Sequence, residues 1–168
     1  MNKASIWTNK DGLAVGFGPR KVEENSAAVV VAGDGHERLA VMKLVGTGLA
    51  AAPTAAQLAN TAVIPVGAQI KSVRVVVDEA FVGGTSVDLG GYTLADADQD
   101  ENGFIAALLT ATLVSGYDET YTAPATNKGG AYIGTQLAAS VKVVPSYNTS
   151  GYTAGIATVT IAFEMPAN

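Results

Sequence analysis

The sequence contains no cysteine and little charge, and each absence excludes a class of function. Without cysteine the chain has no disulfide framework, no cysteine-ligated zinc site and no thiol nucleophile. Charged residues make up only 15% of the chain, from 10 basic and 15 acidic residues. The resulting net charge of −5 lacks the basic footprint of a nucleic-acid binder. We therefore expect no nucleic-acid partner.

Long apolar runs are also missing. No stretch approaches the roughly 20 apolar residues that a membrane-spanning helix needs. The opening MNKASIWTNKDGLAVGFG contains no apolar run of signal-peptide length. We expect a protein that is made and used without classical secretion and without a membrane partner.

Catalytic motifs are equally scarce. His36 is the only histidine, and it lies in the turn-like segment AGDGHER. The nucleophile motif Gly-x-Ser-x-Gly is absent, so His36 has no predicted partner for a catalytic triad. Asp78 and Glu79 are adjacent on a predicted strand, so they face opposite sides and cannot flank one substrate bond. We interpret His36 as a solvated turn residue and expect no catalytic residues and no cofactor.

A cluster of carboxylates occurs in DADQDENG, where Asp96, Asp98 and Asp100 have the i, i+2, i+4 spacing of a calcium-binding loop. The rest of that motif is missing. Its sixth position is Glu101 where the loop needs glycine, and its twelfth is Ala107 where it needs glutamate. These three aspartates are weak candidates for a cation site, and the favoured interpretation is a solvated acidic loop without a metal.

What the sequence does contain is β-strand alternation, together with 19 glycines suited to tight turns. The clearest case is 154–164, for which we predict a central strand because four apolar residues share one parity: Ala157, Val159, Ile161 and Phe163. A second run has the same pattern and includes Val73, Val75 and Val77. The predicted strands are 27–32, 38–45, 70–81, 85–90, 137–144 and 154–164.

Several connections are predicted as well. Gly83-Gly84 predicts a hairpin between 70–81 and 85–90, and 27–32 and 38–45 form a second hairpin. A helical turn is expected to start at Pro53. The segment 104–113 fits either a helix face or a buried strand, and 91–103 and 115–136 are predicted loops. The fold class is all-β, an antiparallel β-sandwich with at most one or two short helices; a jelly roll and another sandwich topology both fit this pattern.

Residues 1–26 differ from the rest and are predicted to be an extended N-terminal arm, followed by the sandwich domain over 27–168. Turn residues at 9–12 and the glycines and proline at 16–19 interrupt regular structure. The arm carries scattered apolar residues and one basic residue, which are our candidate partner-binding residues: Ile6, Trp7, Leu13, Val15, Phe17 and Arg20. An isolated arm cannot bury these groups itself, so they pack either on another molecule or back on their own domain.

Two segments resemble a known class. IPVGAQIKSVRVVVDEAFVGGTSVDLGG at 64–91, followed by an acidic loop and GFIAALL, and WTNKDGLAVGFGPR at 7–20 are similar to capsid decoration proteins (cement or head auxiliary proteins) of tailed bacteriophages. The resemblance implies a jelly-roll-like, non-enzymatic virion protein that is made in the host cytoplasm and binds the outer capsid surface. It further implies the major capsid protein as partner, self-association as a homotrimer, and an arm that reaches across neighbouring capsid subunits.

Two other functions stay open on the sequence. A host- or glycan-binding head-fibre or tail accessory module is suggested by tyrosines in predicted loops: Tyr92, Tyr117, Tyr121, Tyr132, Tyr147 and Tyr152. A glycosidase-like enzyme is the weakest hypothesis, because no arrangement of carboxylates nominates a catalytic pair.

Overall fold

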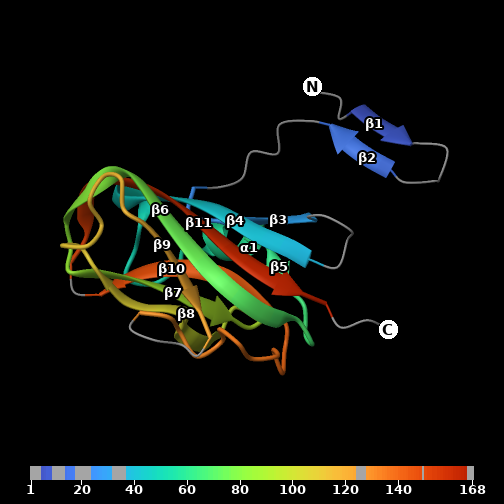
Figure 1. Ribbon diagram of the computed structural model, residues 1–168. Helices are drawn as coiled ribbons and strands as arrows, with labels where there is room; N and C mark the ends of the chain where they lie inside the picture. Colours follow the sequence, from blue (N-terminus) through green and yellow to red (C-terminus); the bar gives the residue numbers. More distant parts are fainter. Residues whose placement is uncertain are drawn as a thin grey trace.

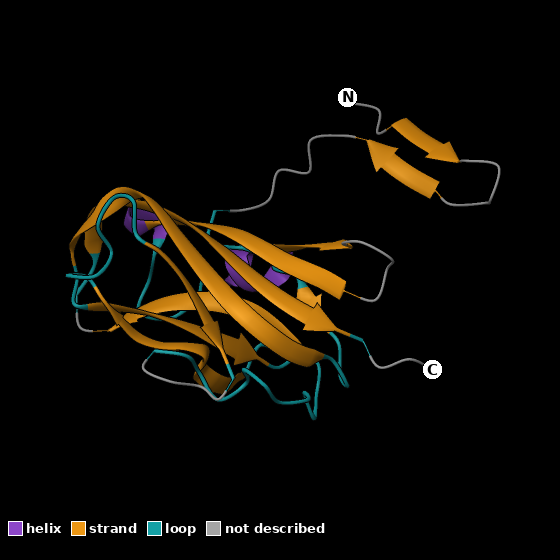
Figure 2. Ribbon diagram, viewed as in Figure 1, coloured by secondary structure: helices purple, strands orange, loops and turns teal. Residues whose placement is uncertain are grey.

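The computed structural model describes residues 5–8, 14–17, 24–31, 37–123, 128–148 and 150–165. Strands make up almost all of the regular structure in these residues (Figure 2). Helix is confined to η1 (Gly46–Gly48) and α1 (Ala55–Asn60). Neither of these described helices is long enough to cross a membrane.

The strands form three antiparallel sheets (Figure 1). A hairpin consists of β1 (Ser5–Thr8) and β2 (Ala14–Phe17). The five-stranded sheet contains, in spatial order, β3 (Ala27–Val31), β4 (Glu37–Val45), β11 (Tyr152–Glu164), β6 (Gln69–Gly83) and β9 (Asp118–Thr122). The four-stranded sheet contains β5 (Val63–Ile64), β10 (Val141–Asn148), β7 (Ser86–Tyr92) and β8 (Asp98–Leu109).

The two larger sheets form a jelly roll. When β4 to β11 are lettered B to I in chain order, one sheet has the order B-I-D-G and the other C-H-E-F. This is the arrangement of a jelly roll, in which the chain alternates between two facing sheets. β3 lies beside β4 and extends the first sheet by one strand. The predicted all-β sandwich is confirmed, and its topology is the jelly roll.

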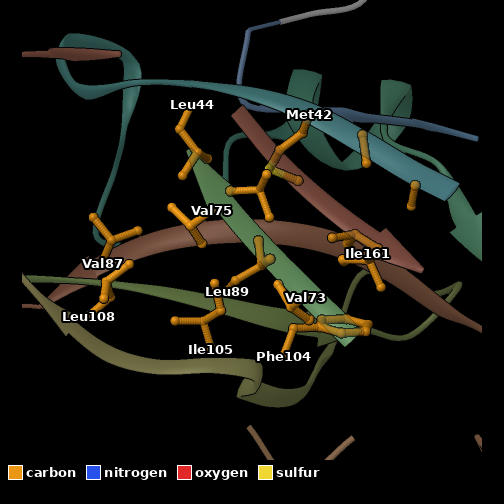
Figure 3. Close-up of a cluster of buried hydrophobic side chains, with 14 of the residues drawn as sticks. Met42, Leu44, Val73, Val75, Val87, Leu89, Phe104, Ile105, Leu108 and Ile161 are labelled. Atoms are coloured by element: carbon orange, nitrogen blue, oxygen red, sulfur yellow. The ribbon is translucent and has the colours of Figure 1, made fainter. Parts of the chain in front are cut away.

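Alternation along the strands builds the core between these sheets. Val75 of β6 lies opposite Val159 of β11, and Val73 lies opposite Ile161. All four are at most 1% exposed. The four-stranded sheet faces them with Leu89, Phe104 and others, and Figure 3 shows the side chains of both sheets directed into one cluster. The predicted central position of 154–164 is confirmed, since β11 lies between β4 and β6.

The predicted hairpin between 70–81 and 85–90 is wrong. β6 and β7 belong to different sheets, and the chain crosses from one to the other at Gly83-Gly84. Both glycines have positive φ, 85° and 57°. A Cβ at Gly84 would lie 2.3 Å from the ring of Tyr152, so glycine is needed for a close approach as well as for the backbone angle.

Four other segments differ from their predictions, and for 104–113 the structure selects the strand from the two alternatives. The helix is capped by Thr54, whose side chain accepts from Gln57 in a capping box, so Pro53 precedes the helix. The ambiguous segment 104–113 enters strand β8, and the predicted loops 91–103 and 115–136 contain the start of β8 and the whole of β9. β10 begins at Val141, later than the predicted 137, and runs to Asn148.

Candidate interaction surface

The β1–β2 hairpin carries the described part of the predicted arm. Trp7 pairs with Val15, and Ser5 pairs with Phe17. Because directly opposed residues share a face of an antiparallel pair, the positions of Trp7, Val15 and Phe17 lie together on one face of the hairpin. Ile6 falls on the other face, opposite Gly16. Leu13 and Arg20 lie outside the described residues.

This hairpin has no second layer in the described structure. It consists of four residue pairs, and neither strand joins either of the larger sheets. In Figure 1 it extends away from the sandwich. A lone two-stranded hairpin is at best marginally stable in water, and a face with three apolar positions adds a reason to dock. Among the described strands, the hairpin is therefore the candidate interaction surface.

The point where the arm joins the sandwich is firmly held. Asn25 is 1% exposed, and its Oδ1 accepts from the Val45 amide at 2.7 Å while its Nδ2 donates to the Val45 carbonyl at 3.2 Å. Its φ of 60° turns the chain, a conformation that asparagine tolerates better than most residues. Thr61 accepts from the Ala27 amide at 3.0 Å and donates to the Val143 carbonyl at 2.6 Å. These bonds tie β3 to β4 and to the opposite sheet. The domain boundary at residue 26 stays a prediction.

The outer face of the five-stranded sheet is defined by rows of cross-strand partners. One row runs across all five strands through Ala28, Val41, Thr160, Arg74 and Thr120. At the β3–β4–β11 side, these side chains are small or β-branched. At the β6–β9 side, the row ends beside charged groups. Along this row, the outer face thus changes from small and β-branched side chains on β3, β4 and β11 to a charged side chain on β6.

A depression of about 370 Å³ opens on the β3–β4–β11 side, and we call it the β3 pocket. Ala28, Val41 and Thr158 line it together with Ser26, and Glu24 and Lys43 complete its wall. Ser26 is 1% exposed, and its hydroxyl has no hydrogen-bond partner among the described residues. Buried polar atoms are nearly always paired, so this hydroxyl is an unpaired hydrogen-bonding group beside a mainly apolar lining.

The charged edge is organised by Arg74 and Asp118. Nε and Nη2 of Arg74 donate to the two carboxylate oxygens of Asp118 at 2.8 and 2.5 Å. The hydrogen bond from Arg74 is the main cause that lowers the pKa of Asp118, with the guanidinium charge adding to it. Both side chains are about half exposed, so the pair contributes little to stability and keeps this edge hydrated.

The three candidate aspartates do not form a cluster. Asp96 follows β7 in a turn and pairs with Lys142, whereas Asp98 and Asp100 lie on β8 opposite Tyr92 and Gly91. The predicted acidic loop is thus partly a strand. Among the described residues, no group of three or more histidine, aspartate or glutamate side chains is placed to hold a metal ion. His36 lies outside the described residues.

Three of the six tyrosines form hydrogen bonds within the chain through their hydroxyls. The Tyr117 hydroxyl donates to Glu119 and lies 2.8 Å from that of Tyr121, and burial with these bonds raises the pKa of Tyr117. The Tyr152 hydroxyl lies 2.9 Å from Thr110 Oγ1. Burial raises the pKa of Tyr132 to about 12, and its hydroxyl has no partner in the described part of the chain.

Sequence reasoning nominated residues of the hairpin as contacts, which stays a prediction, and it missed the β3 pocket. Ala28 and Val41 come from two strands, and nothing in either strand alone indicates a hollow between them. The available signal was the pair of small residues Ser26 and Ala28 at one parity beside a bulkier predicted strand.

The sequence matches no protein-family model and no curated protein. The structure is similar to a chain in the acidic stable capsid structure of Helicobacter pylori bacteriophage KHP30, with a TM-score of 0.51, 14% identity, and coverage of 84% of this chain and 94% of the other. It is also similar to a chain in the capsid of Ralstonia phage GP4, with a TM-score of 0.51, 15% identity, and coverage of 82% and 90%. At these identities the likeness shows a shared fold over nearly the whole of two chains of similar length.

Proposed function

We propose that this chain is a structural virion protein of a tailed phage that binds the outer surface of the capsid lattice and stabilises it. The single observation that carries the proposal is the β1–β2 hairpin, which has the Trp7, Val15 and Phe17 positions on one face and no second sheet over it among the described strands. A jelly roll shared with chains of two phage capsids supports the same function. No catalytic step or cofactor forms part of it.

In this proposal the sandwich is the folded domain, and the arm makes the contacts that attach it to the capsid. The predicted contact residues Ile6, Trp7, Leu13, Val15, Phe17 and Arg20 would meet neighbouring subunits of the shell. The partners would be the major capsid protein and further copies of this chain in a homotrimer. Apolar burial stabilises by roughly 25 cal/mol per Å², and ordering the arm offsets part of that gain. Repetition on a symmetric shell then multiplies weak contacts.

The test is deletion of residues 1–20, followed by co-sedimentation with capsids that lack the protein. We expect the melting temperature of the sandwich to stay unchanged and attachment to weaken about 100-fold or more, because both the arm contacts and the avidity they support are lost. A truncated chain that no longer folds would assign the arm to the core. A truncated chain that attaches like the full chain would remove the arm from the interface.

A matched pair of variants sharpens this test. Replacing Trp7, Val15 and Phe17 by serine removes the apolar face of the hairpin, and the control Thr8→Ser with Ala14→Ser changes the opposite face. The proposal requires that only the first variant lose attachment. Equal loss in both would show that the hairpin acts through its backbone.

The alternative of a host- or glycan-binding head-fibre or tail accessory module has less support. Tyr121 and Tyr152 are buried, and the hydroxyls of Tyr117, Tyr121 and Tyr152 are engaged within the chain. Tyrosines that bind sugars need free faces or free hydroxyls. Clear binding on a glycan array, with and without calcium, would revive this alternative.

A further inference from the structure

We propose that the β3 pocket binds the Trp7 side chain of a second copy of this chain. The inference rests on the proposed function, because it names the partner of the arm: the neighbouring copy on the shell. Each copy would donate its hairpin to one neighbour and receive the hairpin of another. Such head-to-tail contacts close into a ring under rotational symmetry, which agrees with the proposed homotrimer.

The chemistry of the pocket selects the occupant. Ala28 and Val41 offer an apolar lining, and the buried Ser26 hydroxyl lacks a partner in the described structure. Because a serine hydroxyl can both donate and accept, a guest that is largely apolar and carries one hydrogen-bonding group suits this lining. The indole of tryptophan has this composition, since it carries one N–H on a large apolar ring system. The only aromatic residues before Glu24 are Trp7 and Phe17, and phenylalanine has no donor.

The pocket lies at the point where the arm leaves the sandwich. Glu24 and Ser26, which line the pocket, are also where the described sandwich begins, so the arm of each copy departs from its own pocket wall. The six residues between Phe17 and Glu24 can span at most about 25 Å, which limits how far the hairpin can lie from Glu24. A neighbouring copy whose β3 pocket lies within the same reach can exchange arms with this copy.

The described hairpin favours exchange over docking on the same copy. It joins neither larger sheet and extends away from the sandwich (Figure 1). Every chain has one hairpin face and one β3 pocket. When two copies exchange arms, the hairpin face of one copy covers the pocket of the other.

Trp7 is the only tryptophan, so intrinsic tryptophan fluorescence reports on this residue alone. We expect the emission of the full chain to shift to shorter wavelength as the concentration rises, in step with oligomer mass measured by sedimentation. Trp7→Ala should weaken association about 30-fold, as expected for a central aromatic anchor. Ala28→Arg, which fills the pocket with a charged side chain, should weaken association to a similar degree and keep the emission at long wavelength.

Controls separate a blocked pocket from a damaged fold. Ser72→Arg places the same side chain on the same outer face, one strand beyond β11, and should associate normally. Ala28→Leu fills the pocket without adding charge and should also prevent the shift. Each variant is compared with the full chain by circular dichroism and melting temperature.

Mixing two variants decides whether exchange occurs. Trp7→Ala keeps the pocket and has no tryptophan, whereas Ala28→Arg keeps Trp7 and has a blocked pocket. Mixing them should shift the emission of the Ala28→Arg chain to shorter wavelength. No shift on mixing, or a shift in the full chain that is independent of concentration, would overturn the proposal in favour of docking on the same copy. Emission that shifts only when capsids are added would overturn it in favour of the capsid protein.

Failure of the proposed function can be distinguished from failure of the pocket inference. If full-length chains exchange arms but do not co-sediment with capsids, the pocket inference stands and the attachment role falls. If Ala28→Arg attaches and associates like the full chain, the pocket inference falls and the attachment role stands.

Discussion

The β1–β2 hairpin and the β3–β4 pair are both antiparallel pairs of mainly apolar strands, but only the second has a sheet beneath it. β4 pairs with β11 in the five-stranded sheet, and the inward residues Ala27, Ala40, Met42 and Leu44 are at most 3% exposed. The hairpin has a similar apolar row at Trp7, Val15 and Phe17 and joins neither larger sheet in the described structure. Alternation of apolar residues thus favours strands in both regions. Only the β3–β4 pair is further stabilised by burial against a second sheet.

The largest expected effect comes from disrupting the core between the two sheets of the sandwich. Val75 is 0% exposed and lies opposite Val159, so Val75→Asp places an unpaired charge in the core. We expect a loss on the order of 5 kcal/mol, enough to unfold a domain of ordinary stability. Circular dichroism and thermal melting measure it.

The control is Thr160→Asp, which adds the same charge to the outer face opposite Arg74. Its melting temperature should change little. If Val75→Asp melts like the unmodified protein, the two faces of β6 have been assigned the wrong way round.

A smaller effect should follow from loosening the joint between β3 and the opposite sheet. Thr61→Val keeps the shape but removes the bonds to the Ala27 amide and the Val143 carbonyl. Leaving two buried backbone groups unpaired should cost about 2 kcal/mol. This change removes a link between β3 and the opposite sheet, a kind of link that the β1–β2 hairpin lacks in the described structure.

Hydrogen exchange locates that effect. The Ala27 amide should exchange faster in Thr61→Val, while amides in the β6–β11 pairing keep their protection until global unfolding. Thr160→Val is the matched control, with the same substitution on the outer face. Equal destabilisation by both variants would mean that the loss reflects the threonine hydroxyl in general and not this joint.

The same comparison explains which parts of the fold the sequence predicts. Alternation identified β6, β11 and their inward residues, because burial of one face is a property of a strand itself. It could not identify strand partners. Gly83-Gly84 supplies the positive φ that a tight hairpin needs, and a crossing between sheets uses the same angles. β9 was missed because DETYT is short and polar at the edge of a sheet, where only Tyr121 is buried.

The candidate surface was predictable only in part. The apolar residues of the arm are visible in the sequence, but their grouping on one face depends on the register that places Trp7 opposite Val15. The β3 pocket depends on small side chains at Ser26 and Ala28 meeting Val41 across a strand pair. Such a hollow is a product of pairing between strands, so the small residues at one parity are a local signal that does not locate the pocket by itself.

The smallest expected effect concerns the charged β6–β9 edge, which should remain in water while the β3 edge is covered. Because Arg74 lowers the folded pKa of Asp118, the folded state binds that proton less tightly than the unfolded chain, whose carboxyl has the ordinary pKa of 3.8. The stabilisation is present above about pH 4 and is lost as the pH falls through the lowered folded pKa. Arg74→Gln should therefore melt slightly below the unmodified protein at neutral pH, and the gap should close in acid. Added salt should also narrow the gap by screening the pair, in the oligomer as much as in the monomer. A gap that resists salt once oligomers form would show that this edge is buried too, and the contrast between the two edges of the outer face would be lost.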